Sequence, residues 1–342
     1  MFRGILMSDL TIQLLRLINE GKTLNEISEI LNISHKKIFN YLTMIKNTGY
    51  DFKRNYYSNG DIIYTPEVRY NVPASNEVNL LMSQNDETLR AVVISDTHIG
   101  SEKERLDLLE DTYNYCISKG IHVIFNCSDI IDNISNPGKV DSEDRVNYLL
   151  NNYPFDKSIL NFIVLGNHDI SPLKVYGQNL MTILNNYRHD LVTIGYCEGL
   201  INVKNEAIVL SHPYIDCSLN ANKQSKIVFY GHSHFYKIKN FLSQVRYLGV
   251  SVPPLCNIFT RDISYPGILD IELSFAKGCF DYLNLKQLIP MYGSFVPVNE
   301  NIYYFRRIHT DKMKEEQIAT PKVRTMSPGM SQTDKFNARW YK

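Results

Sequence analysis

The sequence predicts an α/β protein in two parts, a small N-terminal module and a larger domain. Two observations support this prediction. Five short apolar runs in the middle of the chain have the length and composition of buried strands, and polar residues follow each of them closely. The first 65 residues show instead the spacing of three short helices followed by a hairpin. At 342 residues the chain is long enough for two domains.

The N-terminal module begins with three stretches of helical periodicity. The first helix is expected to end near Gly21, because glycine readily adopts the left-handed conformation of a helix cap. Thr23 and Glu26 form the signature of a capping box that opens a second helix, and Ser34 is placed to cap a third. The inner faces are expected at Leu10, Leu14, Leu17 and Ile18, at Ile27, Ile30 and Leu31, and at Ile38, Leu42 and Ile45.

A predicted hairpin follows the third helix. Residues 51–57 and 61–65 are rich in β-forming residues, and Asn59-Gly60 between them is a strong signal for a tight turn. Three helices and a hairpin in this order are typical of a winged helix-turn-helix, and the segment resembles small bacterial modules of that kind. We therefore predict a winged helix-turn-helix domain over residues 1–65.

One face of the third helix is polar, contains no acidic residue and is flanked by lysines. If this helix enters a major groove, the lysines would contact phosphates and an asparagine would contact base edges. The alternative is that the face is merely solvated and the module mediates dimerisation or another protein contact, since residues 1–65 carry eight Lys and Arg against six Asp and Glu. The predicted nucleic-acid contacts are Lys36, Lys37, Lys46, and Asn40 or Asn47.

The remaining chain divides into three predicted parts. Residues 66–87, with two prolines and a polar stretch, are expected to be a linker, and residues 88–300 the larger domain. Residues 301–342 are expected to be a C-terminal extension, in part a mobile tail, because residues 318–342 carry five basic side chains and one acidic one. Strands are expected at residues 91–94, 122–125, 162–165, 207–210 and 227–230, and a second sheet at 247–252, 268–275 and 280–285.

Side chains of the kinds that bind metals follow the five strands in a regular order. Polar groups at the ends of such strands converge on one edge of a layered sheet, so these side chains are expected to form one site. Imidazoles, carboxylates and an amide, without a thiolate, suit Mn, Fe or Zn. Their number exceeds the needs of one ion, and a shared carboxylate can bridge two ions about 3.5 to 4 Å apart. The candidates are Asp96, His98, Asp129, Asn167, His168, Asp169, His212, His232 and His234.

These residues lie in five motifs that resemble those of the calcineurin-like metallophosphoesterase superfamily, in its prokaryotic phosphodiesterase and nuclease-like branch. The resemblance covers residues 88–275. It implies a four-layered α/β/β/α sandwich, here preceded by the winged helix-turn-helix domain, and a metal-dependent phosphoester hydrolase activity. The motifs stand as Asp96-Thr97-His98, Ser128-Asp129-Ile130-Ile131-Asp132, Gly166-Asn167-His168-Asp169, His212, and Gly231-His232-Ser233-His234.

Carried over position by position, the resemblance implies two divalent metal ions, with manganese favoured over iron, zinc or nickel. His168, to which no metal is assigned, would face the substrate and stabilise phosphoryl oxygens or protonate the leaving group, with Asp169 or a neighbour fixing its ring. A metal-bridging hydroxide would attack phosphorus in line. One ion would be held by Asp96, His98, Asp129 and His234, and the other by Asp129, Asn167, His212 and His232.

Two positions in the second motif leave open questions. Asp132 could orient a ligand histidine from outside the metal shell or cap the following segment. Ser128 stands where the motif usually has glycine. We expect this serine to be harmless, although a backbone with positive φ at this position would cost about 1 kcal/mol or more.

The substrate prediction depends on two missing arginines. The serine/threonine protein phosphatases of this superfamily carry arginines where this chain has Asn133 and Leu165. Without them a phosphodiester is favoured over a monoester, and the attached helix-turn-helix favours a nucleic acid or nucleotide, a small cyclic nucleotide included. The predicted function is a phosphodiesterase or nuclease. The alternative is a nucleic-acid-associated regulator with weak or vestigial phosphatase activity, but a vestigial site should have lost ligands.

The amino-acid composition argues against a membrane-spanning segment but excludes few other classes of protein. The formal net charge is zero, so any attraction to nucleic acid must be local. No apolar run approaches the length of a membrane-spanning helix, and the six cysteines contain no C-x-x-C pair. We therefore expect a cytoplasmic protein with reduced thiols, no membrane partner, and a homodimer as one possible assembly.

Overall fold

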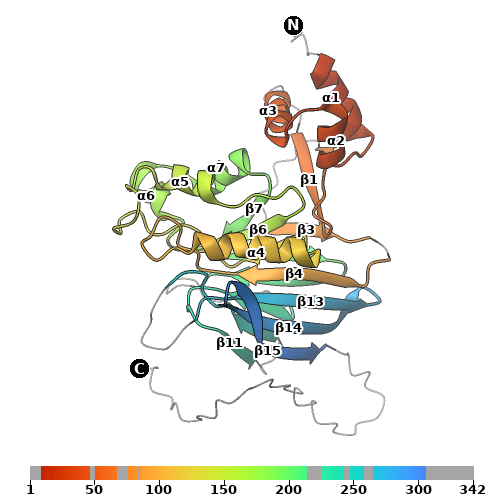
Figure 1. Cartoon of the computed structure of the whole chain (residues 1–342). Helices are drawn as coiled ribbons and strands as arrows, with labels where there is room; N and C mark the ends of the chain where they lie inside the picture. The colour runs from red at the N-terminus through yellow and green to blue at the C-terminus, as the bar shows by residue number, and fades with distance from the viewer. Residues whose placement is uncertain are drawn as a thin grey trace, which may run out of the picture.

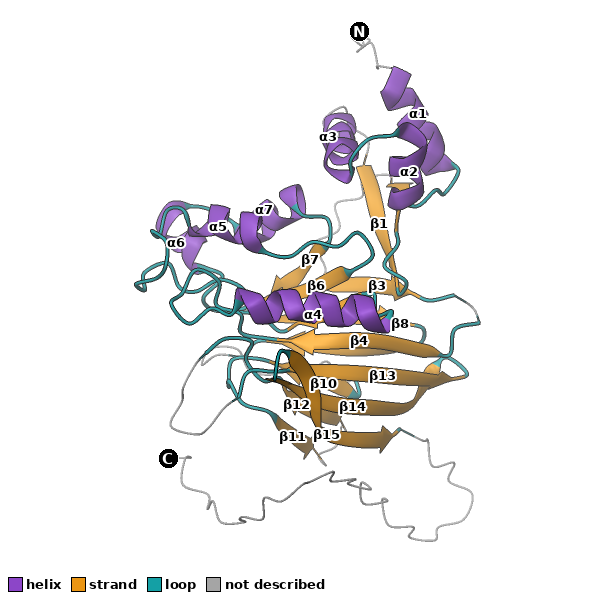
Figure 2. Cartoon of the chain, in the orientation of Figure 1, coloured by secondary structure: helices purple, strands orange, loops and turns teal. Residues whose placement is uncertain are grey.

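In the computed structural model, two β-sheets pack face to face and helices cover one of them (Figures 1 and 2). The structure describes residues 9–46, 51–67, 76–83, 85–213, 225–241, 247–257 and 265–305. The helices are α1 (Asp9–Asn19), α2 (Leu24–Leu31), α3 (His35–Lys46), α4 (Leu106–Lys119), α5 (Arg145–Asn152), α6 (Ser171–Tyr176) and α7 (Leu180–Tyr187).

A seven-stranded sheet forms the centre of the larger domain, in the order β15-β14-β13-β4-β5-β6-β7. Strands β4 to β7 are parallel, whereas β13, β14 and β15 are antiparallel. The central parallel strands are buried on both faces, which explains why they are continuous apolar runs. The strands are β4 (Thr88–Ile94), β5 (Val123–Asn126), β6 (Leu160–Leu165), β7 (Leu191–Tyr196), β13 (Ile268–Ala276), β14 (Cys279–Met291) and β15 (Ser294–Tyr304).

An eight-stranded sheet lies against the first, in the order β11-β12-β10-β9-β8-β3-β1-β2. Apolar side chains of both sheets form one continuous core between them. A second core lies between the seven-stranded sheet and helices α4, α5 and α7. The strands are β1 (Asp51–Tyr57), β2 (Ile62–Glu67), β3 (Glu77–Leu81), β8 (Glu198–Val203), β9 (Glu206–Ser211), β10 (Ile227–Tyr230), β11 (Lys237–Phe241) and β12 (Tyr247–Ser251).

The N-terminal elements follow the predicted order of three helices and a hairpin. The Thr23 hydroxyl accepts the Glu26 N–H, and the Glu26 carboxylate accepts the Thr23 N–H, so the capping box is formed. Gly21 has the expected left-handed φ of 72°. Strands β1 and β2 pair around the turn that contains Asn59 and Gly60. The assignment of this module as a winged helix-turn-helix domain stays a prediction.

The hairpin is not separated from the larger domain by an extended linker. Part of the predicted linker forms strand β3, which pairs with β1 on one side and with β8 on the other. Tyr56 of β1 also packs edge-on against Phe162 of β6, with 5.4 Å between the ring centroids. The N-terminal hairpin and the larger domain therefore share a sheet and a core.

Three other features differ from the prediction. Strands β13 and β14 belong to the first sheet, where β13 pairs with β4 and β14 with β13, and only β12 joins the second, because local periodicity identifies a strand but not its partner. No described helix covers the outer face of the eight-stranded sheet, so the described residues form three layers there instead of the implied four. The predicted domain end at residue 300 lies inside β15, and residues 306–342 of the predicted extension lie outside the described ranges.

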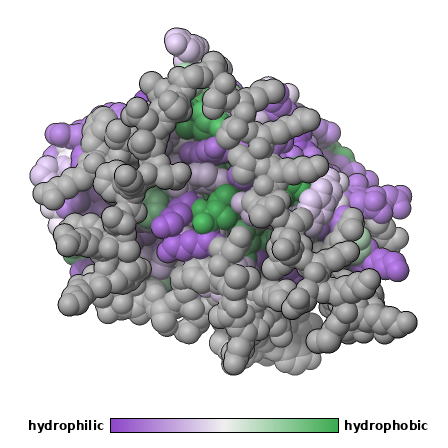
Figure 3. All heavy atoms as spheres, turned by 90° about the horizontal axis from the view of Figure 1, so that it is seen from below, coloured by the Kyte–Doolittle hydropathy of each residue, from purple (hydrophilic) through white to green (hydrophobic). Residues whose placement is uncertain are grey.

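The described surface is of mixed polarity. Seen from below, small apolar areas lie among polar side chains (Figure 3). Within the described ranges, no helix has both the length and the apolar character needed to cross a bilayer.

Candidate metal centre

The candidate ligands gather at one edge of the two sheets, beyond the carboxyl ends of five strands. Asp96 follows β4, Asp129 follows β5 and Asn167 follows β6, all in the seven-stranded sheet. His212 follows β9 and His232 follows β10, both in the eight-stranded sheet. The candidate site thus lies across the junction of the two sheets.

Three overlapping groups of side chains bring their ligand atoms within 4.8 Å of one another. Asp129 belongs to two of the groups and His98 also to two. The Asp129 Oδ2 atom lies 3.1 Å from Nε2 of His212 and 4.0 Å from Nε2 of both His98 and His168. This oxygen has the central position expected of a bridging ligand. The groups are Asp96, His98 and His234; His98, Asp129 and His168; and Asp129, His212 and His232.

Several polar atoms of the site are buried and make no well-aligned hydrogen bond among the described residues, although Oδ2 of Asp129 and Nε2 of His212 lie 3.1 Å apart. Burying a polar atom without a partner costs on the order of 1 to 3 kcal/mol, so such atoms normally have a ligand or water. Four such atoms belong to candidate ligands, and all four are nitrogen or oxygen atoms that can coordinate a divalent ion. The donor set therefore fits a metal centre. The four atoms are Nε2 of His98, Oδ2 of Asp129, Oδ1 of Asn167 and Nε2 of His212.

The backbone of the site is held in an unusual conformation. Six of its non-glycine residues have positive φ, which L-residues adopt only at a cost of about 1 to 3 kcal/mol each. A side chain at Gly166 would collide with Asp129 and His212, and one at Gly231 would collide with Ser95. Close packing of backbone loops thus brings the ligands together. The six residues are Asp96, His98, Ser128, Asp129, His232 and His234.

Carboxylates and imidazoles in the site shift one another's pKa values. Burial favours the neutral imidazole, but the nearby carboxylates outweigh it and raise the pKa of His98 to about 10 and that of His212 to about 9. Burial likewise opposes ionisation of Asp96, yet hydrogen bonds from His234 and His98 hold its pKa well below the usual range. The carboxylates therefore stabilise positive charge in the site, and a divalent ion would supply that charge in place of protons on the imidazoles.

Asp132 contacts two of the histidines. Its Oδ1 atom lies 2.9 Å from Nδ1 of His168 and 3.3 Å from Nδ1 of His98. Burial would raise the pKa of Asp132, but hydrogen bonds from these two rings lower it well below its ordinary value. These are the contacts that the orienting interpretation of Asp132 predicts, since a carboxylate on Nδ1 leaves Nε2 directed into the site.

Asp169 contacts the backbone and not the ring of His168. Its carboxylate accepts N–H groups from Gly166 at 2.7 Å and from Ile131 at 3.0 Å. Burial and the nearby Asp129 raise its pKa. The expectation that Asp169 or a neighbour fixes the His168 ring is thus met by Asp132, while Asp169 ties the second and third motifs together.

Ser128 adopts a left-handed conformation, with a φ of 51°. Its hydroxyl donates to Oδ2 of Asp169 at 2.5 Å and accepts the Ile130 N–H at 3.1 Å. A glycine would avoid the cost of positive φ but would lose both hydrogen bonds. The serine is therefore accommodated because its side chain satisfies a buried carboxylate.

Two substitutions separate these opposing effects. We expect Ser128→Ala to lower the free energy of unfolding by about 1 kcal/mol more than Ser128→Gly does. Both variants lose the hydrogen bonds, but only alanine keeps a Cβ atom at positive φ. Urea unfolding of the two variants measures the difference, and equal stabilities would show that positive φ carries no cost at this position.

Two interactions that position residues of the site could not be recognised from the sequence. The backbone carbonyl of Cys127 lies 2.7 Å from Nδ1 of His212 and orients that ring. Arg145, although 1% exposed, donates to the carbonyl oxygens of Asn133 and Asn136 and so holds the loop that follows Asp132. A backbone acceptor and a buried arginine on a short helix cannot be recognised from residue spacing.

The predicted nucleic-acid contacts are not part of this site. Lys36, Lys37 and Asn40 are exposed on α3. The backbone of Lys46 ends α3, but its side chain and Asn47 lie outside the described residues. The candidate residues thus form two groups, one at the metal centre and one on α3.

Comparison with known proteins decides the nature of the larger domain. Residues 89–251 match the family of calcineurin-like phosphoesterases. This stretch is a calcineurin-like phosphoesterase domain. The family implies a metal-dependent phosphoester hydrolase with a dimetal centre, and all the candidate metal ligands lie within the matched residues.

Solved structures similar to the phosphoesterase domain include two examples. Vps29 from Entamoeba histolytica, complexed with zinc, is 12% identical, covering 64% of this chain and 99% of that chain with a TM-score of 0.36. A dimetal phosphatase from Danio rerio is 11% identical, covering 61% of this chain and 98% of that chain, also with a TM-score of 0.36. Structural similarity with such low sequence identity and TM-scores does not indicate the substrate of this protein. A search of curated proteins found no significant match.

Proposed function

We propose that the protein is a dimetal-dependent phosphodiesterase that acts on nucleic acid or nucleotides. The observation that carries the proposal is the set of unpartnered, buried ligand atoms around Oδ2 of Asp129, within a calcineurin-like phosphoesterase domain. A regulator with a vestigial site would not need to retain them. We favour manganese, with iron, zinc or nickel as alternatives.

The proposed ligands divide between two ions that share Asp129. When bound, two divalent cations would supply an activated water and would neutralise charge on the phosphoryl group. The side chains proposed to hold them are Asp96, His98, Asp129 and His234 for one ion, and Asp129, Asn167, His212 and His232 for the other.

The accessible side of the centre indicates where substrate binds. His212 is fully buried, whereas the side chains of His168 and His234 are 24% and 18% exposed and His232 is exposed. Nδ1 of His168 lies 2.9 Å from Oδ1 of Asp132 and 3.1 Å from the Asn133 backbone nitrogen, so Nε2 is the ring atom left to contact a phosphoryl oxygen or the leaving oxygen. We propose that His168 meets the substrate and that Asp132 positions it.

The described surroundings favour a diester over a monoester. Leu165 is buried and Asn133 contributes no cation, and the guanidinium of Arg145 is engaged with backbone carbonyls. Among the described residues, no arginine contacts the candidate ligands or His168. A monoester dianion would lack a cationic partner beyond the metals, whereas a diester carries one negative charge and needs less compensation.

This proposal predicts a preference between two nitrophenyl substrates. With manganese, we expect kcat/KM for bis-nitrophenyl phosphate to exceed that for the mono-nitrophenyl ester on the order of tenfold, the effect of one missing charged hydrogen bond. We also expect hydrolysis of DNA, RNA or a cyclic nucleotide in the same buffer. A preference for the monoester, with none of these activities, would overturn the diesterase proposal while leaving the metal centre intact.

We further propose that α3 contacts nucleic acid through its exposed lysines. Because the hairpin shares a sheet and a core with the phosphoesterase domain, the test belongs on the full chain and not on an isolated fragment. Lys37→Ala should weaken DNA binding across sequences and lower the salt slope by about one unit. Lys277→Ala, a change at an exposed lysine of the β13–β14 turn, is the control. Unchanged binding in Lys37→Ala would favour a protein-contact or dimerisation role for the module.

A further inference from the structure

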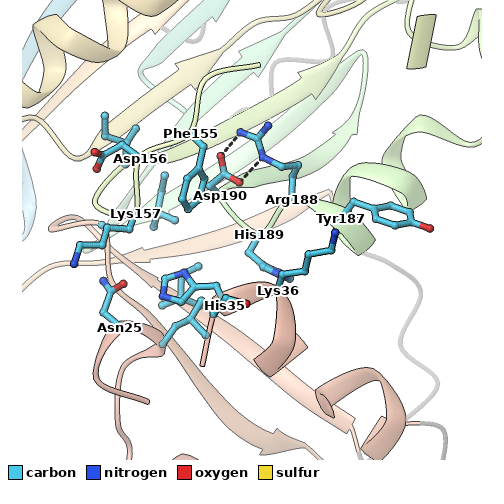
Figure 4. A pocket seen from close by; sticks show the side chains of 16 residues that line it. Asn25, His35, Lys36, Phe155, Asp156, Lys157, Tyr187, Arg188, His189 and Asp190 are labelled. Carbon is cyan, nitrogen blue, oxygen red and sulfur yellow. Dashed lines mark hydrogen bonds and ion pairs between the residues drawn. The ribbon is translucent and has the colours of Figure 1, made fainter. Parts of the chain in front are cut away.

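A pocket of about 370 Å³ lies between the N-terminal module and the phosphoesterase domain (Figure 4). One wall is formed by the first residues of α2 and α3 and by the turn of the hairpin. The other wall is formed by the loop before β6 and by the residues between α7 and β7. The two parts of the chain thus meet around a cavity large enough for a small molecule.

This pocket is separate from the metal centre. Leu160 lines the pocket at the start of β6, whereas Asn167 lies just beyond the other end of that strand. A six-residue strand spans about 20 Å. The pocket therefore lies at the opposite edge of the sheet, and the phosphoryl chemistry of the metal centre does not account for it.

The polar part of the pocket is suited to an anion. Lys36 and Lys157 line it, and within the described ranges neither forms an ion pair with a carboxylate. The carboxylates of the pocket are already engaged: Asp190 with Arg188 at 2.7 Å, and Asp156 with Ser158 at 2.5 Å. Ser34 accepts the N–H groups of Lys37 and Ile38, whereas the N–H groups of His35 and Lys36, at the very start of α3, have no acceptor among the described residues and add partial positive charge.

The apolar part of the pocket is suited to a flat ring. Phe155 lines it with 60% of its surface exposed, an unusual state for a large aromatic side chain. The Arg188 guanidinium lies over this ring, 5.8 Å from its centre. Leu24, Ile62 and Leu160 add aliphatic surface. Aromatic side chains of this kind provide stacking surfaces for nucleobases.

Two polar atoms of the lining residues have no partner among the described residues. His189 is only 8% exposed, yet its Nδ1 atom makes no hydrogen bond, and the same holds for Oδ1 of Asn25. Burial lowers the pKa of His189 to about 3, so its ring is a neutral hydrogen-bonding group. Figure 4 shows Asn25 and Lys157 on one side of the His35 ring and Lys36 on the other. Unsatisfied buried atoms beside a stacking ring and free cations indicate a ligand with complementary groups.

We propose that this pocket binds a nucleoside phosphate, either a free nucleotide or the phosphorylated end of a strand. The base lies against Phe155 and offers its polar edge to Asn25 and His189. The phosphate lies near Lys157 and the first turn of α3. The proposal concerns a second site and does not depend on hydrolysis at the metal centre.

Calorimetric titration of the full-length protein in EDTA tests the proposal without hydrolysis of the probe. AMP, GMP, CMP and UMP are the probes, with the matching nucleosides and ribose 5-phosphate as fragments. We expect at least one nucleotide to bind about tenfold more tightly than either of its fragments, since both halves of the pocket contribute. Phe155→Ala and Lys157→Glu should each weaken that binding about tenfold. Both side chains are exposed, so the variants should fold.

Three control variants locate the binding. Tyr292→Ala removes another exposed aromatic ring and Lys277→Glu reverses another exposed lysine, both on the far hairpins, and these variants should bind like the unmodified protein. Asp129→Asn should also bind normally, because the metal centre is not involved. A 5′-phosphorylated oligonucleotide that competes with the nucleotide would identify a strand end as a ligand, and failure to compete would identify the free nucleotide. Absence of binding by all four nucleotides, loss of binding in Asp129→Asn, or normal binding in Phe155→Ala and Lys157→Glu would overturn the proposal.

Discussion

Asp129→Asn is expected to remove nearly all phosphoesterase activity while the protein stays folded. The Oδ2 atom of Asp129 lies between Nε2 of His212 and Nε2 of His98, so both proposed ions depend on its charge. The amide keeps the shape of the side chain and an oxygen for the His168 N–H, which lies 2.9 Å away. Loss of several kcal/mol of charge stabilisation corresponds to a decrease in kcat/KM on the order of 1,000-fold.

Elemental analysis of the same variant tests the assignment independently of activity. We expect fewer than two metal equivalents per chain. Asp270→Asn changes another buried carboxylate, on β13 and hydrogen-bonded to Tyr115, and should keep both metals and the activity. Two tightly bound metals together with full turnover in Asp129→Asn would rule out a bridging role for this residue.

His168→Ala is expected to keep both metals and to lose activity on the order of 100-fold, the usual contribution of a positioned acid or base. The reason is that Nδ1 of His168 contacts Asp132, while the side chain is 24% exposed and its Nε2 lies 4.0 Å from Oδ2 of Asp129. If the ring protonates the leaving oxygen, nitrophenyl esters should lose less than alkyl esters do, since nitrophenolate leaves without a proton.

The dependence on leaving group distinguishes two roles of this histidine. Equal losses for good and poor leaving groups would indicate that His168 stabilises charge on the phosphoryl oxygens instead of transferring a proton. His122→Ala is the control, because His122 lies at the start of β5, at the opposite edge of the sheet, where its Nδ1 contacts the Ser158 carbonyl. Loss of metal from His168→Ala would contradict its assignment to the substrate.

The clustering of the candidate ligands could be predicted from the sequence because the motifs follow strands that are apolar on both faces. Burial on both faces makes β5 and β6 continuous apolar runs, and parallel strands place their carboxyl ends at one edge. Asp96, Asp129 and Asn167 then had to converge. The N-terminal helices were equally accessible to prediction, because the capping box at Thr23 and Glu26 is a local interaction.

Features that depend on contacts distant in the sequence could not be predicted in this way. The pairing of β13 with β4, and of β3 with both β1 and β8, is decided by packing between segments far apart in the chain. The double contact of Asp132 with His98 and His168 depends on how two loops meet. The pocket around His189 is likewise formed only where two parts of the fold come together.

The pairing of β3 with both β1 and β8 has a consequence for how far apart the two ends of a bound substrate lie. A module on a flexible linker can take many positions relative to its neighbouring domain. A module that shares a sheet with that domain stays at a fixed distance from it. The wall of the pocket that Leu160 forms is separated from the candidate metal centre by the length of β6, about 20 Å, which is the rise of about six base pairs. If nucleic acid is the substrate, as proposed, a strand held in this pocket would reach the metal centre over a fixed number of nucleotides, and the sheet would set that number.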